Sequence, residues 1–393
     1  MRQPQGFVDQ SKPNHVCRLD RCLYGLKQAP KEWNQELNKF LLSAGFVRSL
    51  CDPCLYIMRH GSLYIFITIW VDDLLVASND PKRFAVVKKL MTDKFDIKDL
   101  GVLSWFLGVC VSRDRSAGTI SLSQEQYIVQ ILDRFGMSQC KPVSTPEPAG
   151  DELTAADSPS TDEEKAAMAE VPYRQAVGAL MYLRFTRPDI GNALRSLSKF
   201  GHNPGPAHWR RCKRVLRYLS GSSKLVVTYS RSAEPADLFA YCDASFANDP
   251  DRRRSTTGWC AMLSGAAISW ASRTQKLVSL STCEAEYIAV TDCMREMLWL
   301  RQLHEELGFP LQEPSIIFED NQACISMANN AGVTRRNKHI DTKFHFVRDA
   351  ILQRKAVLIY KQTKAMVADL LTKGLAKPQF EKLRAVLLGK SKR

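Results

Sequence analysis

The sequence contains no long hydrophobic run. Its longest apolar stretch, residues 63–71, is too short to span a bilayer, and two aspartates follow it. The first six residues include no hydrophobic signal region. The twelve cysteines do not show the spacing of a disulfide framework, which favours reduced thiols inside a cell. We therefore expect an intracellular protein without a membrane partner, in a cytoplasmic particle or in the nucleus.

Acidic residues are scarce relative to basic ones. The 55 lysines and arginines exceed the 41 aspartates and glutamates, which gives a formal net charge of +14. Such an excess favours a polyanionic partner, most simply nucleic acid, and a generic basic surface is the alternative. A length of 393 residues with 45% hydrophobic residues predicts two or three domains with real cores.

Composition and periodicity divide the chain into blocks, without an internal repeat. The first block, about 1–140, is mixed, and residues 141–164 predict an exposed linker because they are rich in Pro, Ser, Thr, Asp and Glu. The elements expected in the first block are helices at 30–44, 81–94 and 124–135, strands at 54–59, 63–70 and 74–78, and a hairpin at 104–113 and 119–122.

The second block, 165–235, is expected to be helical. Its third helix, 206–219, is strongly basic and contains Arg210 and Arg214. A solvated face is the default interpretation of such a run, and a nucleic-acid face is the alternative. The third block, 236–393, has alternating strands and helices, which predicts a mixed α/β domain.

Asp72 and Asp73 lie between two strand-like segments, 63–71 and 74–77. A hairpin there would present both carboxylates at its tip. Each carboxylate must be solvated, hydrogen-bonded or bound to a cation. A hard divalent ion is one natural partner, and an ordinary aspartate-rich turn is the alternative.

Acidic residues of the third block fall at the ends of buried elements. Asp243 follows the strand expected at 238–242, and Asp320 follows the strand near 315–318. If these strands are neighbours, the two carboxylates face one another and repel unless a cation lies between them. On the long helix that follows, Glu286 points the same way as an apolar stripe, whereas Glu284 lies on a more polar face. Glu286 is therefore the better ligand candidate.

Asp369 lies at the expected start of a C-terminal helix. Alone it is an acid stabilised by the helix dipole. With Asp243, Glu286 and Asp320 it could complete a four-carboxylate cage for two Mg²⁺ (or Mn²⁺) ions. Such a pair of ions can activate water and stabilise the leaving oxygen of a phosphodiester.

These residues resemble the C-terminal part of a Ty1/copia-type retrotransposon Pol polyprotein over nearly the whole chain. The similar segments are Cys22–Pro30, Trp70–Leu74, Phe106–Gly108, Thr186–Ile190, Cys242–Ser245, Ser255–Gly258, Glu284–Tyr287, Glu319–Gln322, Lys338–Asp341 and Ala368–Lys373. The resemblance implies a partial reverse transcriptase palm and thumb at 1–140, a helical connection at 165–235, and at 236–393 a ribonuclease H-like domain. That domain would have a mixed five-stranded sheet with flanking helices.

The resemblance also implies roles for single residues. Asp72 and Asp73 match the paired metal-binding aspartates of the polymerase, and Trp70 replaces a tyrosine near the primer end. The segment that lies against nucleotide and template corresponds to Gly25, Leu26, Lys27 and Gln28. The ribonuclease H carboxylates correspond to Asp243, Glu286, Asp320 and Asp369, with Asp341 a rival for the last and His339 a further polar residue of the site.

One departure from the family concerns the polymerase. The family has a third catalytic aspartate upstream of the stretch that corresponds here to residues 3–7. We therefore expect an incomplete polymerase site with little activity, and metal-dependent cleavage of RNA in RNA–DNA hybrids by the C-terminal domain. The expected partners are such hybrids, single-stranded or duplex nucleic acid, and other Pol chains. The alternative is a non-catalytic nucleic-acid-binding remnant of a transposon.

Overall fold

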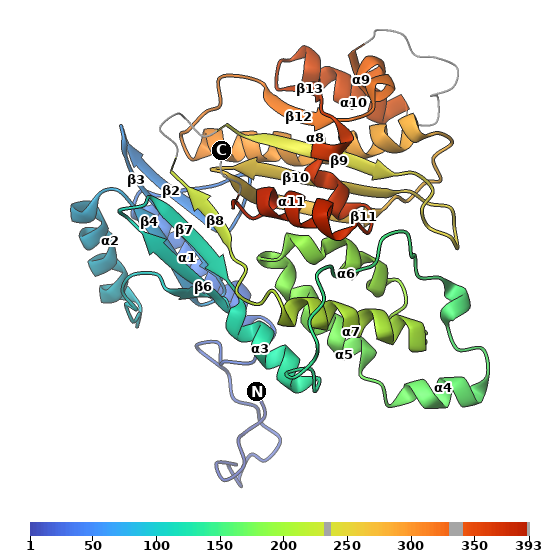
Figure 1. Ribbon diagram of the computed structural model, residues 1–393. Helices are drawn as coiled ribbons and strands as arrows, with labels where there is room; N and C mark the ends of the chain where they lie inside the picture. The colour runs from blue at the N-terminus through green and yellow to red at the C-terminus, as the bar shows by residue number, and fades with distance from the viewer. Residues whose placement is uncertain (232–236, 330–340, 391–393) are drawn as a thin grey trace. The chain divides into compact units, whose positions relative to one another are not determined.

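The computed structural model describes residues 1–231, 237–329 and 341–390, and the side chains of 341 and 344 are outside the description. The chain divides into two compact units, Met1–Gly101 and Val102–Arg393, and each is described by itself (Figure 1). No helix of the described residues is long and apolar enough to cross a membrane.

Unit 1 is built on a four-stranded antiparallel sheet in the order β1-β2-β3-β4. Its elements are α1 (Ala29–Ser43), β1 (Val47–Arg48), β2 (Leu55–His60), β3 (Leu63–Trp70), β4 (Asp73–Ser78) and α2 (Pro81–Lys94). Alternate residues of β3, namely Ile65, Ile67 and Ile69, are buried. They share a core with Leu37 of α1 and Met91 of α2. The expected helices and the expected three strands of this region are confirmed.

Unit 2 contains a mixed five-stranded sheet in the order β11-β10-β9-β12-β13. Its strands are β9 (Phe239–Ser245), β10 (Thr256–Leu263), β11 (Ala266–Thr274), β12 (Ser315–Glu319) and β13 (Ala356–Tyr360). The first three form an antiparallel meander, and β12 runs parallel to both β9 and β13. The resemblance implies a mixed five-stranded sheet in this part of the chain, and the structure confirms the sheet.

Helices cover both faces of the five-stranded sheet (Figure 1). Side chains of β9 alternate between the two cores that lie there. Ala240 and Cys242 lie in the core with α8, α9 and α10. Tyr241 points to the other face, where Leu383 of α11 belongs to the same core. The helices on the two faces are α8 (Thr282–Glu306), α9 (Gln322–Asn329), α10 (Asp341–Leu352), the short η6 (Val367–Leu371) and α11 (Lys377–Leu387).

The region before this sheet is helical, as expected. Its helices are η1 (Ala155–Asp157), α4 (Asp162–Ala169), α5 (Tyr173–Tyr182), η2 (Leu183–Phe185), η3 (Pro188–Ile190), α6 (Gly191–Ser198) and α7 (Pro206–Ser220). Arg187 forms a buried ion pair with Asp189, at 2.8 Å. Burial alone would raise the pKa of Asp189, but Arg187 outweighs burial and lowers it. Tyr218 of α7 donates to Asp189 and accepts from Arg384 of α11, so this network joins the helices to the C-terminal segment.

The units do not divide where the composition changes. A hairpin and helix expected in the first block belong to unit 2, where β7 pairs with β8 in a second sheet of order β5-β6-β7-β8. The elements concerned are β5 (Trp105–Phe106), β6 (Val109–Asp114), β7 (Thr119–Ser123), α3 (Glu125–Arg134) and β8 (Val227–Ser230). The local composition does not show that β7 pairs with β8, because the two strands are about a hundred residues apart in the chain. The compact units therefore divide after Gly101, and the predicted domain boundary near 140 stays a prediction.

The linker expected to be exposed is partly buried. Thr145, Glu147 and Leu153 are buried within residues 141–154, which we call the strap. Four side chains on one face of α7 hold it. Arg217 Nε donates to the Lys141 carbonyl (2.7 Å), Arg214 to the Thr145 hydroxyl (2.9 Å), Arg211 to the Asp151 carboxylate (2.7 Å) and His208 Nε2 to the Thr154 carbonyl (3.1 Å). The expectation of an exposed linker is wrong for the buried residues of the strap, because these donors satisfy strap groups that water would otherwise solvate. Residues 160–164 are exposed, as expected.

Candidate active site

Three carboxylates from separate elements of unit 2 meet at one edge of the five-stranded sheet. They are Asp243 of β9, Glu286 of α8 and Asp320 just after β12, and one oxygen of each lies within 4.8 Å of the others. Asp243 is 2% and Glu286 7% exposed, whereas Asp320 is half-buried. The structure thus brings together three of the four carboxylates predicted for this site.

Strand register explains the meeting of the two aspartates. In the parallel pair of β9 and β12, Tyr241 lies beside Phe318. Asp243 and Asp320 each come two residues later, so both are at the carboxyl ends of neighbouring parallel strands. The start of α8 places the glutamate, because the Ser281 hydroxyl caps the helix by accepting from the Glu284 N–H at 3.2 Å.

Glu319 is a further carboxylate at this edge, to which the sequence assigned no role. Its side chain is fully buried, and its Oε1 accepts from the Asn321 N–H at 3.1 Å. Its Oε2, like that of Glu286, has no hydrogen-bond partner among the described residues. An acid inside the otherwise apolar strand 315–319 was the available signal.

Burial and mutual repulsion make this cluster electrostatically costly. Burial raises the pKa of Glu286 well above its usual range, and Glu319 and Asp243 raise it further. The pKa of Glu319 is raised well above the usual range for the same reasons, and that of Asp243 is also raised. Carboxylate oxygens are the ligands that Mg²⁺ prefers, and two of these lack a partner. The residues present therefore fit a divalent cation.

Asp369, the fourth predicted carboxylate, lies beside Asp243 but outside the group of three. Its Oδ1 is 2.7 Å from Lys373 Nζ, and its Oδ2 accepts from Gln379 at 3.3 Å. Burial, together with Asp243, raises the pKa of Asp369 to about 7, although Lys373 opposes the rise. The Thr372 hydroxyl donates to Asp243 Oδ2.

The two other residues predicted near this site, Asp341 and His339, cannot be compared with Asp369 in the structure. α10 begins at Asp341, whose side chain is not described, and His339 lies outside the described residues. The choice between Asp369 and Asp341 as fourth carboxylate therefore stays a prediction.

The aspartates of unit 1 lie at the tip of a hairpin, as expected. Trp70 pairs with Asp73, so Val71 and Asp72 form a two-residue turn between β3 and β4. Val71 adopts a φ of 55°, rare for a β-branched residue, and its carbonyl accepts from the Trp33 indole at 2.7 Å. Both carboxylates are exposed, and no group of three metal-ligating side chains in the described residues includes them.

The other polymerase residues of the prediction are also at the surface. Gly25, Lys27 and Gln28 are exposed in the turn before α1, and Leu26 is half-buried there. Trp70 is 58% exposed. The roles of these residues in nucleotide, template or primer contact stay predictions.

The basic helix α7 divides between an internal and an external face. Arg214 is half-buried and donates to Thr145, so the structure gives it an internal partner instead of a free surface position. Arg210 is exposed and stays a candidate for nucleic-acid contact.

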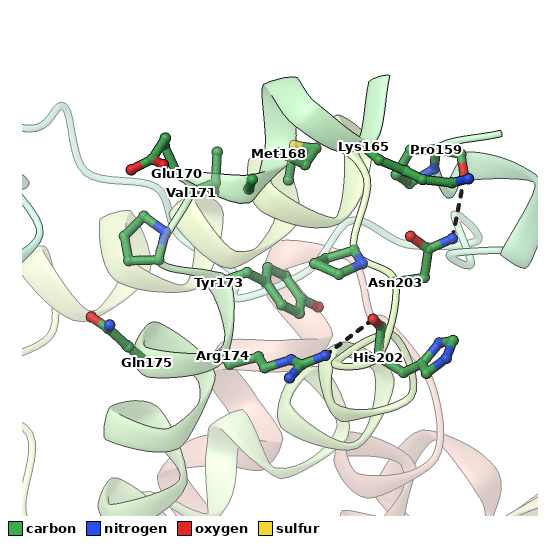
Figure 2. Close-up of a pocket in the computed structure, with 13 residues that line it drawn as sticks. Pro159, Lys165, Met168, Glu170, Val171, Tyr173, Arg174, Gln175, His202 and Asn203 are labelled. Carbon is green, nitrogen blue, oxygen red and sulfur yellow. Dashed lines mark hydrogen bonds between the residues drawn. The ribbon is translucent and has the colours of Figure 1, made fainter. Parts of the chain in front are cut away.

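A groove of about 490 Å³ lies among α4, the start of α5 and residues 202–204 (Figure 2). Figure 2 shows Tyr173 within it and Arg174 donating to the His202 carbonyl, at 3.2 Å. Asn203 donates to the Pro159 carbonyl, also at 3.2 Å. None of the predicted site residues lines this groove.

Comparisons with known proteins show the family to which the chain belongs. Residues 1–149 match a family model described as reverse transcriptase (RNA-dependent DNA polymerase). A putative transposon Ty5-1 protein of Saccharomyces cerevisiae is 35% identical, over 76% of this chain and 94% of that protein. The chain belongs to the copia-type retrotransposon Pol polyproteins.

Longer relatives show how much of such a polyprotein this chain covers. The retrovirus-related Pol polyprotein from transposon TNT 1-94 of Nicotiana tabacum is 40% identical over 97% of this chain. The match takes up 29% of that polyprotein, so the chain spans less than a third of it. A solved foamy viral protease-reverse transcriptase, bound to an RNA/DNA hybrid, matches 87% of this chain with 13% identity and a TM-score of 0.47. The chain thus corresponds to a part of a copia-type Pol polyprotein, and its residues 1–149 match the reverse transcriptase model.

Proposed function

We propose that unit 2 cleaves the RNA strand of RNA–DNA hybrids in a reaction that requires a divalent metal ion. The observation that carries this proposal is the meeting of Asp243, Glu286 and Asp320 within 4.8 Å. Membership of the copia-type retrotransposon Pol polyproteins, with a reverse transcriptase match over residues 1–149, supports the choice of substrate. The net charge of +14 suits a polyanion, and Arg210 is one exposed contact candidate.

The three carboxylates would hold Mg²⁺ or Mn²⁺ by their oxygens. Such an ion, when bound, lowers the pKa of water and neutralises charge that develops on a phosphodiester. The rest of the site positions these ligands. Thr372 fixes one oxygen of Asp243 by donating to it, and the N-cap of α8 sets the position of Glu286.

Replacement of Asp243 by asparagine tests the proposal. We expect cleavage of a labelled RNA–DNA hybrid with Mg²⁺ or Mn²⁺ to fall by more than about a hundredfold, since losing even an indirect partner of a metal costs 10- to 100-fold. Asp133→Asn is the matched control, because Asp133 is an exposed aspartate of α3, and it should cleave like the wild type. Cleavage that survives Asp243→Asn refutes the assignment.

The same assay separates the proposal from a non-catalytic nucleic-acid-binding remnant. A wild-type chain that binds the hybrid but leaves it intact with both metal ions would be such a remnant. Binding is measured with the same labelled hybrid in the presence of a chelator.

A further inference from the structure

The loop 246–255 joins β9 to β10 at the edge of the sheet where the carboxylates meet. Ser245 lies opposite Thr256 in the register of these two strands. The loop therefore begins three residues beyond Asp243, about 10 Å along the strand. Residues 252–254 of this loop are consecutive arginines. We call the segment 246–255 the arginine loop.

The three arginines have no partner of opposite charge within the part of the chain that the structure describes. Arg252 and Arg253 are exposed and Arg254 is half-buried. No side-chain hydrogen bond or ion pair joins any of them to another described residue. Arg273 of the neighbouring β11 lies opposite Thr257 and is also exposed. Free guanidinium groups of this kind bind phosphate well, because each can donate two parallel N–H bonds to it.

The two acids of the arginine loop face the helical region instead of the arginines. Asp249 is buried and forms an ion pair with Lys199, at the end of α6, at 2.8 Å. Burial alone would raise the pKa of Asp249, but Lys199 outweighs burial and lowers it. Asp251 accepts from the Ala155 N–H with both oxygens, at 2.9 and 3.1 Å. Partners outside the loop thus hold both acids away from the arginines.

Hydrogen bonds within the loop fix its backbone. The Arg253 N–H donates to the Asp249 carbonyl at 2.8 Å, and the Asp249 N–H donates to the Arg254 carbonyl at 3.0 Å. At the base of the loop the Ala247 N–H donates to the Ser255 hydroxyl, also at 3.0 Å. A loop that is already ordered loses less conformational entropy when it binds a ligand. The arginines are therefore presented in a prearranged way.

We propose that the arginine loop binds the phosphate backbone of the RNA–DNA hybrid beside the cleaved bond, and that Lys199 is the positioning residue that holds this loop. A separation of about 10 Å from Asp243 corresponds to about three nucleotides, because the phosphates of one strand follow at about 3.4 Å along the helix axis. This inference rests on the proposed function, and it concerns how the same site holds its substrate.

Binding of a labelled RNA–DNA hybrid to the full chain, in a chelator and at several salt concentrations, tests the contact. Arg252→Gln combined with Arg253→Gln should lower the slope of log affinity against log salt by about 2, about 1 for each lost phosphate contact. Lysine at both positions keeps the charge and should keep most of the slope.

A control pair of cations lies at the opposite edge of the same sheet. Arg354 and Lys355 are exposed and come directly before β13, which runs parallel to β12. Arg354→Gln combined with Lys355→Gln removes the same charge and should keep the wild-type slope. An unchanged slope for the two loop substitutions, or an equal fall in this control, overturns the inference.

The positioning role of Lys199 has a readout of its own. Lys199→Met leaves the Asp249 carboxylate free to pair with the arginines, so it should weaken hybrid binding. It should have no further effect in the chain that already carries Arg252→Gln and Arg253→Gln. Lys199→Arg keeps the ion pair and should bind like the wild type. Effects that add in the combined variant would make Lys199 an independent contact, and the positioning role would be wrong.

The outcomes also separate this inference from the proposed function. Circular dichroism confirms that each variant is folded, and cleavage is measured separately with Mg²⁺ or Mn²⁺. A wild type that binds hybrid through the arginine loop but does not cleave it refutes the function and leaves the phosphate contact standing. A wild type that cleaves hybrid, with an affinity that the loop substitutions leave unchanged, does the reverse.

Discussion

At the scale of single residues, Gly258 sets how closely the C-terminal segment approaches the carboxylates. It lies beside Asp243 in the register of β10 with β9. A Cβ at this position would lie 2.5 Å from Thr372 Cγ2 and 3.0 Å from the Ala368 carbonyl oxygen. Only a residue without a side chain lets Thr372 reach Asp243, so the glycine of the segment Ser255–Gly258 has a steric reason.

Gly258→Ala should therefore disturb both stability and the site. We expect the free energy of unfolding to fall by about 1–3 kcal/mol, the usual cost of overpacking a core, and hybrid cleavage to fall with it. Gly178→Ala is the matched control, because no atom lies within 4 Å of a Cβ there. In the middle of α5 it should stabilise by roughly 0.5–1 kcal/mol. Urea unfolding measures both, and equal stabilities of the two variants would contradict the steric argument.

The part of the site that follows from the pattern of buried strands and helix faces could be predicted from the sequence. Asp243 and Asp320 follow buried strands, and Glu286 shares its direction with an apolar stripe, so their meeting follows from local pattern. The pairing of Asp369 with Lys373 does not, because the sequence indicates only a helix start at Asp369 and gives Lys373 no role. Glu319 has a local signal, an acid at the end of an apolar strand, but only the tertiary packing shows that its side chain is buried.

At the scale of elements, α7 uses its positive charge mainly inside the protein. Arg211 donates twice to the Asp151 carbonyl, at 3.0 and 3.1 Å, and once to its carboxylate at 2.7 Å. Arg210, the adjacent residue, is exposed. A helix face that looks like a nucleic-acid surface in the sequence is thus largely the support of the strap.

Replacement of Arg211 and of Arg210 by methionine should have different effects. Arg211→Met leaves the Asp151 carbonyl without its donors, so we expect a loss of about 1–3 kcal/mol in unfolding free energy and faster proteolysis within the strap. Arg210→Met should leave both unchanged and weaken hybrid binding modestly, with a smaller salt dependence. Limited proteolysis and a binding titration at two salt concentrations measure these effects. Equal protease sensitivity of the two variants would argue against the support role of Arg211.

The composition of the strap predicts exposure, and there is a physical reason why part of it is buried instead. A segment rich in proline, serine and acids buries little apolar side-chain area, and from the sequence this predicts exposure. Its polar groups are instead satisfied by donors from α7, some sixty to seventy-five residues later in the chain. The burial of the strap depends on hydrogen bonds to residues far away in the chain, and the local sequence does not show those residues.

At the scale of the whole molecule, the compact units and the family boundaries differ. The match to the reverse transcriptase model ends at residue 149, whereas the units divide after Gly101. Two sets of contacts fix the structural division. β7 pairs with β8 from Thr119↔Ser230 to Leu122↔Val227, and α3 contributes to the same core as α5 and α7. Residues 102–149, which match the reverse transcriptase model, thus belong to the compact unit that carries the carboxylate cluster.

Shortened chains distinguish the two boundaries. A chain starting at Val102 retains β7 and α3, so we expect it to unfold in one cooperative transition and to cleave hybrid. A chain starting at Lys141 loses Ile128, Ile131 and Leu132 from the core, each worth about 1.5–3 kcal/mol, and leaves β8 unpaired. It should melt at a lower temperature and aggregate through the exposed strand edge. If the chain starting at Lys141 melts at as high a temperature as the chain starting at Val102, the boundary near 140 is the correct one. The contacts of β7 and α3 then add nothing to the stability of residues 141–393.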